Sequence, residues 1–261
     1  MKPGKFVKFL TFVTFLFFYV PLFVVVLFSF NSSRSPVWTG FTLKWYVELF
    51  TRSYAIWRAF WNSIMVAVLS STTATVLGTM TAIGLYWVKN GKKKSSGDTF
   101  LWFLTYLPFV VPDVIIGISL LLFFSLLQFR LGFSTIVLAH VTFSIPYTMM
   151  VVYSRLHDFD KNIVEAAYDL GATETQVLFK VLIPNLVPSI VAAFLLAFTL
   201  SIDDFVITFF VAGPGTTTLP IQIYSMIRFG ISPTINAIST FMIAGTVLIG
   251  FALRKFVRYI F

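Results

Sequence analysis

Apolar residues lie in long blocks along the chain, separated by shorter polar segments. Blocks of about 20 residues with few or no charges are long enough to cross a hydrocarbon core of roughly 30 Å as helices. The blocks predict six transmembrane helices, at about residues 9–30, 62–88, 99–127, 132–154, 187–211 and 234–253. We therefore expect an all-α, multi-pass integral membrane protein.

The polar segments divide the chain into three parts. Residues 1–57 hold the first helix and an outer loop, residues 58–253 form a membrane domain with the other five helices, and residues 254–261 form a tail. The basic start resembles that of a signal peptide. Its apolar run is too long for one, and no small-x-small cleavage site follows it. We expect an uncleaved first helix.

Composition strengthens the membrane assignment. Hydrophobic residues make up 58% of the chain, which includes 32 Phe, and charged residues only 11%. An ordinary soluble domain carries about 25% charged residues. A water-soluble protein of this size could not keep so many Phe side chains off its surface, so the lipid bilayer is the expected surrounding.

The basic residues indicate an orientation. With the N-terminus inside, thirteen Lys and Arg fall on inner segments and six on outer ones. Cytoplasmic loops carry the excess of Lys and Arg, so both termini are expected in the cytoplasm. The clearest local signal is the run KKK at residues 92–94. The net charge of +9 is then a topology signal, and no nucleic-acid partner is expected.

Candidate catalytic chemistry is sparse. The chain has no Cys, which excludes disulfides and thiolate metal sites, and it has no G-x-x-x-x-G-K-[ST] phosphate loop. His140 and His157 lie far apart in the predicted topology, without zinc-binding spacing. We expect no catalytic site, metal or cofactor. His140 is expected to be a packing or helix–helix contact residue, with a pathway-lining role as the alternative.

One outer loop, residues 31–57, is rich in turn-forming and aromatic residues. Such a segment could cap the outer face or dock a partner. It could equally be an interfacial segment with an aromatic belt. Both interpretations stay open.

The inner loop of residues 155–186 is far longer than a helical hairpin needs. Asp160 can cap a first short helix, and Gly171 can end it in the left-handed conformation. Thr173 and Gln176 form a T-x-x-Q capping box for a second short helix, and Pro184 ends that helix or opens the next span. The loop is therefore expected to be two short helices at a sharp angle.

The two faces of the first short helix differ in chemistry. Glu165 and Asp169, four residues apart, are expected on its polar face, and Ala166 and Ala167 allow close approach. Its predicted apolar face consists of Ile163, Val164, Ala167 and Leu170. Helices that lie on a bilayer favour Lys and Arg on the polar face. The acidic face therefore favours a protein partner over the membrane surface.

Three acidic residues lie inside predicted spans, namely Asp113, Asp203 and Asp204. Each costs about 2.5–3.5 kcal/mol at a helix centre on insertion scales. Phe205 and Phe209 follow the pair, and carboxylates with aromatic faces suit an ammonium group. Because adjacent helical residues point about 100° apart, one aspartate would line a pathway while the other caps or pairs. A purely structural role is the alternative, and it is favoured for Asp113, beside the kinking prolines Pro108 and Pro112.

The inner loop resembles the signature of permease subunits of ABC importers. The signature residues are Glu165, Ala166, Ala167, Gly171, Val181, Ile183 and Pro184. Segments such as SFNSS at 29–33, GFTLKWY at 40–46 and SIDDFVITFFVAGPG at 201–215 are similar to the second membrane subunit of spermidine/putrescine importers. The resemblance covers nearly the whole chain.

The resemblance implies a type I importer fold, in a bacterial inner membrane, with coupling helices seated in a groove of a cytoplasmic ATPase. The expected coupling residues are Glu165, Ala166, Ala167, Asp169, Gly171 and Pro184. It also implies a heterodimer with a sister permease, two ATPase subunits and an extracytoplasmic polyamine-binding protein. The chain would be the transport subunit, with ATP hydrolysis left to its partner.

Two alternatives remain for the function. The same family could import ferric ion or another small solute, such as a different amine. A self-sufficient secondary transporter would show inverted repeats or helices broken in matching positions, and the sequence reveals neither.

Overall fold

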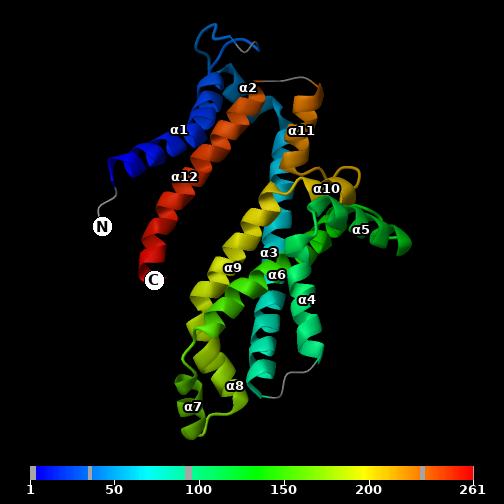
Figure 1. Cartoon of the computed structure of the whole chain (residues 1–261). Coiled ribbons are helices and arrows are strands. Elements are labelled where there is room, and N and C mark those ends of the chain that lie inside the picture. Colours follow the sequence, from blue (N-terminus) through cyan, green and yellow to red (C-terminus); the bar gives the residue numbers. More distant parts are fainter. Residues whose placement is uncertain (1–3, 35–36, 92–95, 230–232, 261) are drawn as a thin grey trace. The chain divides into compact units, whose positions relative to one another are not determined.

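The structure is a computed structural model that describes residues 4–34, 37–91, 96–229 and 233–260, and these residues are mostly helical (Figure 1). The KKK run predicted as a topology signal, at 92–94, lies outside the described residues. Within them, the only β-type pairing is an isolated antiparallel bridge between Asn31 and Phe41. The predicted all-α architecture is confirmed for this part of the chain.

Within the described residues, thirteen helical elements follow one another. They are α1 (Lys5–Phe28), α2 (Lys44–Arg52), α3 (Tyr54–Gly91), α4 (Ser96–Val110), α5 (Asp113–Leu126), α6 (Phe133–His157), α7 (Lys161–Asp169), α8 (Glu174–Gln176), the π-helix η1 (Val177–Leu182), α9 (Ile183–Asp203), α10 (Val206–Val211), α11 (Leu219–Phe229) and α12 (Thr234–Ile260).

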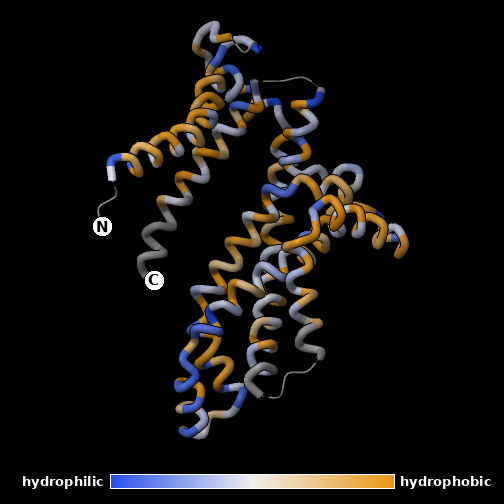
Figure 2. The backbone as a smooth tube through the Cα atoms, viewed as in Figure 1, coloured by the Kyte–Doolittle hydropathy of each residue, from blue (hydrophilic) through white to orange (hydrophobic). Residues whose placement is uncertain are grey.

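In the part of the chain that the structure describes, four helices are long and apolar enough to cross a membrane, and a fifth span arises if one bent pair is counted as one. The four are Lys5–Phe28, Tyr54–Trp87, Phe133–His157 and Glu174–Asp203, and the bent pair is Trp102–Val110 with Asp113–Leu126. Thr234–Leu248 forms a shorter apolar helix. Figure 2 shows hydrophobic residues along α1, α5 and α9, and hydrophilic residues gathered around α7 and α8.

Two of the predicted spans are interrupted. The sequence predicts a kink at Pro108 and Pro112, and there α4 and α5 meet at 112°. Proline lacks the N–H that an α-helix needs, and Pro112 has an extended ψ of 140° just before α5. Residues 187–211, predicted as one helix, are divided between α9 and α10, because Asp204 is extended with ψ 123°.

The chain forms two compact units, residues 58–221 and residues 1–57 with 222–261. In the first unit, α6 packs along α9, and α3 approaches α6 closely. A Cβ on Gly78 would overlap the Thr148 side chain and lie 2.8 Å from the backbone nitrogen of Met149. Thr148 Oγ1 donates across this contact to the Ala74 carbonyl at 2.8 Å. Only glycine fits here.

The second unit holds α1, α2 and α12. Trp45 and Leu49 of α2 are buried, and Trp45 Nε1 donates to the Asn31 carbonyl at 2.6 Å. The rings of Phe50, Trp57 and Phe241 contact one another, with centroid separations of 5.4–5.8 Å. The outer loop is therefore folded around α2. Both interpretations of its surface stay open.

Candidate functional site

The inner loop has the caps that its sequence predicts. Asp160 Oδ1 accepts a hydrogen bond from the Asn162 backbone at 3.0 Å and starts α7. Gly171 follows the helix with φ of +81°, the left-handed region that favours glycine. Thr173 and Gln176 then exchange bonds of 2.9 and 3.4 Å in a capping box. The turn between α7 and α8 is thus formed by hydrogen bonds between residues close in sequence.

The faces of α7 agree only in part with the predicted ones. Val164 and Ala167 pack against a buried cluster that contains Leu156 and Val177, while Glu165, Ala166 and Asp169 are exposed as the acidic face requires. Ile163 and Leu170, predicted on the same apolar face, are 45% and 89% exposed, so this face is buried only in part. The reason is that α7 is short and ends at Asp169, so the buried stripe continues at Ala172 beyond the turn.

The second short helix is not a separate element. From Glu174 the chain runs through α8, η1 and α9 as one 30-residue helix that ends at Asp203. In its π-helical turn the N–H groups bond five residues back instead of four. The Ile183 N–H therefore donates to the Leu178 carbonyl. Pro184 lies in the first turn of α9, inside this continuous helix, so it neither ends a separate short helix nor begins the span. Asn185 Nδ2 donates to the Val181 carbonyl at 2.7 Å.

Exposed apolar side chains also lie on α7 and at its C-terminal end. Tyr168 is 41% exposed, and Ile163 and Leu170 are 45% and 89% exposed. The sequence does not single out these exposed residues, because each alone reads as part of an apolar stripe. The loop therefore presents carboxylates and bulky apolar groups together, a combination that suits a protein surface.

At the second polar site, Asp204 lies between α9 and α10. Its Oδ2 accepts hydrogen bonds from the Thr208 backbone at 2.8 Å and from Thr208 Oγ1 at 2.6 Å, and its Oδ1 accepts one from the Ile207 backbone at 3.3 Å. Its side chain is 10% exposed. Asp204 is therefore the member of the acidic pair that caps, and it starts α10.

His140 joins Asp204 to the surrounding helices. Its Nε2 lies 2.8 Å from Thr208 Oγ1 and 3.3 Å from Asp204 Oδ2, and its Nδ1 lies 2.7 Å from Ser201 Oγ. Ser201 Oγ in turn lies 3.0 Å from Ser70 Oγ on α3. The prediction that His140 is a helix–helix contact residue is confirmed by these bonds. Its partners lie 61 and 68 residues away in sequence, which no local pattern reveals.

The other acidic residues at the breaks are exposed. Asp203 is the last residue of α9, and Asp113 is the first residue of α5. Both are exposed, as is Phe209, whose ring packs at 5.6 Å from that of Phe205. Each interrupted span thus carries an exposed carboxylate at its break.

The two interrupted spans contact each other through α5 and α10. A Cβ on Gly117 would lie 2.6 Å from the Phe210 ring and 3.4 Å from Ile207 Cα, so the two helices approach closely. Non-helical backbone is tolerated at membrane depth only where protein or a water-filled cavity satisfies it. The breaks with Asp113 and with Asp203 and Asp204 therefore mark the candidate pathway region.

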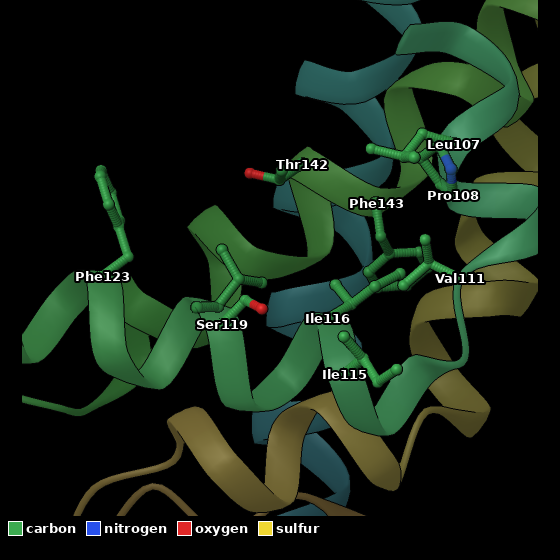
Figure 3. Close-up of a pocket in the computed structure, with 10 residues that line it drawn as sticks. Leu107, Pro108, Val111, Ile115, Ile116, Ser119, Phe123, Thr142 and Phe143 are labelled. Carbon is green, nitrogen blue, oxygen red and sulfur yellow. The ribbon is translucent and has the colours of Figure 1, made fainter. Parts of the chain in front are cut away.

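A pocket of about 440 Å³ lies where α4, α5 and α6 meet (Figure 3). Its lining is almost wholly apolar, with Ser119 and Thr142 as the hydroxyl-bearing members. It includes none of the three aspartates, so its chemistry does not suit a polycation. Among the described residues, no group of three or more His, Asp or Glu side chains could hold a metal ion.

Comparison with known proteins agrees with these features. Residues 74–260 match the family described as binding-protein-dependent transport system inner membrane component. The chain is 43% identical over 244 residues to the putrescine transport system permease protein PotI of Escherichia coli K12, covering 91% of this chain and 85% of PotI. It is 38% identical over 228 residues to the spermidine/putrescine transport system permease protein PotC of the same strain, covering 87% of this chain and 84% of PotC.

Solved structures show the same fold. A bacterial ABC transporter that imports the polysaccharide alginate has a chain with a TM-score of 0.73 at 15% identity, covering 95% of this chain and 94% of that one. The MetNI methionine ABC transporter has a chain with a TM-score of 0.66 at 18% identity, covering 79% of this chain and 96% of that one. The chain belongs to the family of inner membrane components of binding-protein-dependent transport systems.

Proposed function

We propose that this chain is the permease subunit of an ATP-driven ABC importer and forms half of a translocation pathway for polyamines such as spermidine and putrescine. The observation that carries the proposal is its identity of 38–43% to named spermidine/putrescine and putrescine permeases over most of the chain. The exposed carboxylates at two broken spans support a cationic cargo, because a carboxylate attracts an ammonium group.

The proposed topology has six spans with both termini in the cytoplasm. It counts α12 and the bent pair α4–α5 as spans in addition to the four long apolar helices. The excess of Lys and Arg on inner segments supports this orientation. It places the loop of residues 155–186 on the cytoplasmic side, within a membrane domain of residues 58–253.

The cytoplasmic loop is proposed to dock a partner ATPase. The surface is built from Glu165, Ala166 and Asp169 on α7, with Ala167 behind it and the turn at Gly171 holding its angle. Pro184 lies in the first turn of the helix α9, which runs from the loop to the break at Asp203 and Asp204. A displacement of the loop would therefore reach the candidate pathway along one continuous helix.

Substrate contact is proposed at the two breaks. Asp203 and Asp113 offer exposed carboxylates, and Phe205 and Phe209 offer ring faces for cation–π contact. Asp204 belongs to the same region and shapes the break, since its carboxylate is occupied by Thr208 and Ile207.

The proposed partners are a sister permease, two copies of a cytoplasmic ATPase and an extracytoplasmic polyamine-binding protein. The broken helices resemble a feature of secondary transporters, but membership in a binding-protein-dependent family favours energy supplied by a partner.

Uptake of radiolabelled spermidine tests the proposal. The chain, its sister permease and its ATPase are reconstituted in proteoliposomes with the loaded binding protein outside and ATP inside. We expect uptake that needs all of these components, and competition by putrescine. Uptake of ferric citrate instead, with spermidine ignored, would contradict the polyamine assignment and keep the family.

A further inference from the structure

His140 is buried at the point where three helices of the candidate pathway region meet. Only 1% of the residue is exposed, and it lies on α6 with Ser201 of α9 on one side and Thr208 of α10 on the other. Both ring nitrogens have partners. A side chain that only fills space here would not need polar nitrogens, because burying polar atoms costs free energy that an apolar side chain avoids.

The direction of the hydrogen bonds assigns one proton of the ring. Thr208 Oγ1 donates its single proton to Asp204 Oδ2 at 2.6 Å. Thr208 Oγ1 must therefore accept a proton from His140 Nε2, which lies 2.8 Å away. His140 on α6 thus donates to Thr208 on α10, and Thr208 donates in turn to the Asp204 carboxylate.

We propose that His140 is a positioning residue of the transport pathway: through its Nε2 proton it holds Thr208 and Asp204 in place, fixes the break between α9 and α10, and so leaves Asp203 as the exposed carboxylate. The inference rests on the proposed function, because it assigns the positioned carboxylates to a polyamine pathway. His140 itself is 1% exposed and is not proposed to contact the cargo.

The geometry supports this role over simple packing. Asp204 leaves the helical conformation, with ψ 123°, and its side chain then caps α10 through Ile207 and Thr208. The Nε2 side of His140 contacts this cap, while the Nδ1 side reaches Ser201 and, through it, Ser70 of α3. Loss of the Nε2 donor would leave the Thr208 hydroxyl without its donor and free the cap to shift.

Three substitutions test the hydrogen bonds of the two ring nitrogens of His140 separately. His140→Gln keeps an amide donor near the Nε2 position, His140→Asn keeps an amide only near the Nδ1 position, and His140→Leu keeps neither. We expect spermidine uptake per assembled complex to stay within about twofold of the unmodified complex for Gln. It should fall about tenfold for Asn and more for Leu, as expected for a lost hydrogen bond to a buried polar group.

A double-mutant cycle distinguishes positioning from a general loss of stability. If His140 acts through Asp204, His140→Leu combined with Asp204→Asn should be no worse than Asp204→Asn alone. The apparent affinity for the loaded binding protein should stay unchanged throughout. Thr142→Val is the control, since Thr142 lies exposed on the same helix and its hydroxyl donates to the Leu138 carbonyl one turn earlier.

Equal uptake by the Gln, Asn and Leu variants would overturn the inference, as would additive losses in the cycle. If the His140 variants do not assemble, Thr208→Val carries the test, because it removes the hydroxyl between His140 and Asp204 and keeps the side-chain shape. Uptake by Thr208→Val at the unmodified rate would then overturn it. Failure of the unmodified complex to import spermidine would contradict the proposed function and is seen before any variant is made.

Discussion

The loop at residues 155–186 and the break between α9 and α10 both place acidic residues where the apolar helices are interrupted. In the loop, Glu165 and Asp169 are exposed and take no part in the caps that shape α7. At the break, Asp204 is almost buried and accepts bonds from Thr208 and Ile207. Exposed acids are free for a partner, whereas the buried one holds the fold. Acidic residues are therefore proposed to dock a partner in the loop, whereas Asp204 shapes the break between α9 and α10.

The largest effect is expected from Asp204→Ala. It removes the cap of α10 and leaves the Thr208 hydroxyl, which His140 holds, without its acceptor, so the free energy of unfolding should fall by about 2–4 kcal/mol. The apparent melting temperature of the purified complex measures this, and spermidine uptake should fall with it. A complex that melts and transports normally would show that the network at the break is not structural.

Glu165→Ala should impair ATPase docking without lowering the stability of the permease. The side chain is exposed, so the melting temperature of the permease pair should stay unchanged. Retention of the ATPase during purification, and ATP-driven uptake, should each fall at least about tenfold if Glu165 is a hot spot of docking. Lys161→Ala, at the start of the same helix, is the control. Normal ATPase retention and uptake in Glu165→Ala would remove the proposed role of the loop.

A smaller effect is expected at the turn behind α7. Gly171 has φ of +81°, which costs a side chain such as Ala about 1–2 kcal/mol. Gly171→Ala should lower ATP-driven uptake about five- to tenfold by tilting α7. Gly171→Asn is the matched variant, because Asn tolerates the left-handed conformation better. Similar losses in both variants would point to contact at this position instead of backbone geometry.

The smallest effect is expected from Asp203→Asn. Exposed ion pairs are worth about 0.2–1 kcal/mol, so uptake should fall by no more than about fivefold, with no change in melting temperature. The loss should be greater for spermidine, with three ammonium-forming nitrogens, than for putrescine, with two. If Asp203→Asn lowers the melting temperature as Asp204→Ala does, Asp203 has a structural role and the different roles assigned to the two aspartates are wrong.

Much of this fold follows from local sequence. Block hydrophobicity marks the apolar helices, and Pro108 and Pro112 mark the bend between α4 and α5. Asp160, Gly171, Thr173 and Gln176 mark the turns of the loop because caps depend on residues within a few positions.

The rest depends on distant residues. No proline or glycine lies at the break between α9 and α10, where Asp204 leaves the helix and is held by contacts from His140 on another helix. Leu170 is likewise exposed because Val164, Ala167 and Ala172 make the contacts with the buried cluster. Such features arise from tertiary packing, which a pattern along one helix does not contain.

The most direct test of the account measures spermidine uptake by proteoliposomes with and without the ATPase. With the chain, its sister permease, the ATPase, ATP and the loaded binding protein, we predict uptake against a concentration gradient. Omitting the ATPase or replacing ATP with a non-hydrolysable analogue should abolish it. Spermidine accumulation by the permease chain without any ATPase would contradict the central claim, because the chain would then be a transporter with its own source of energy.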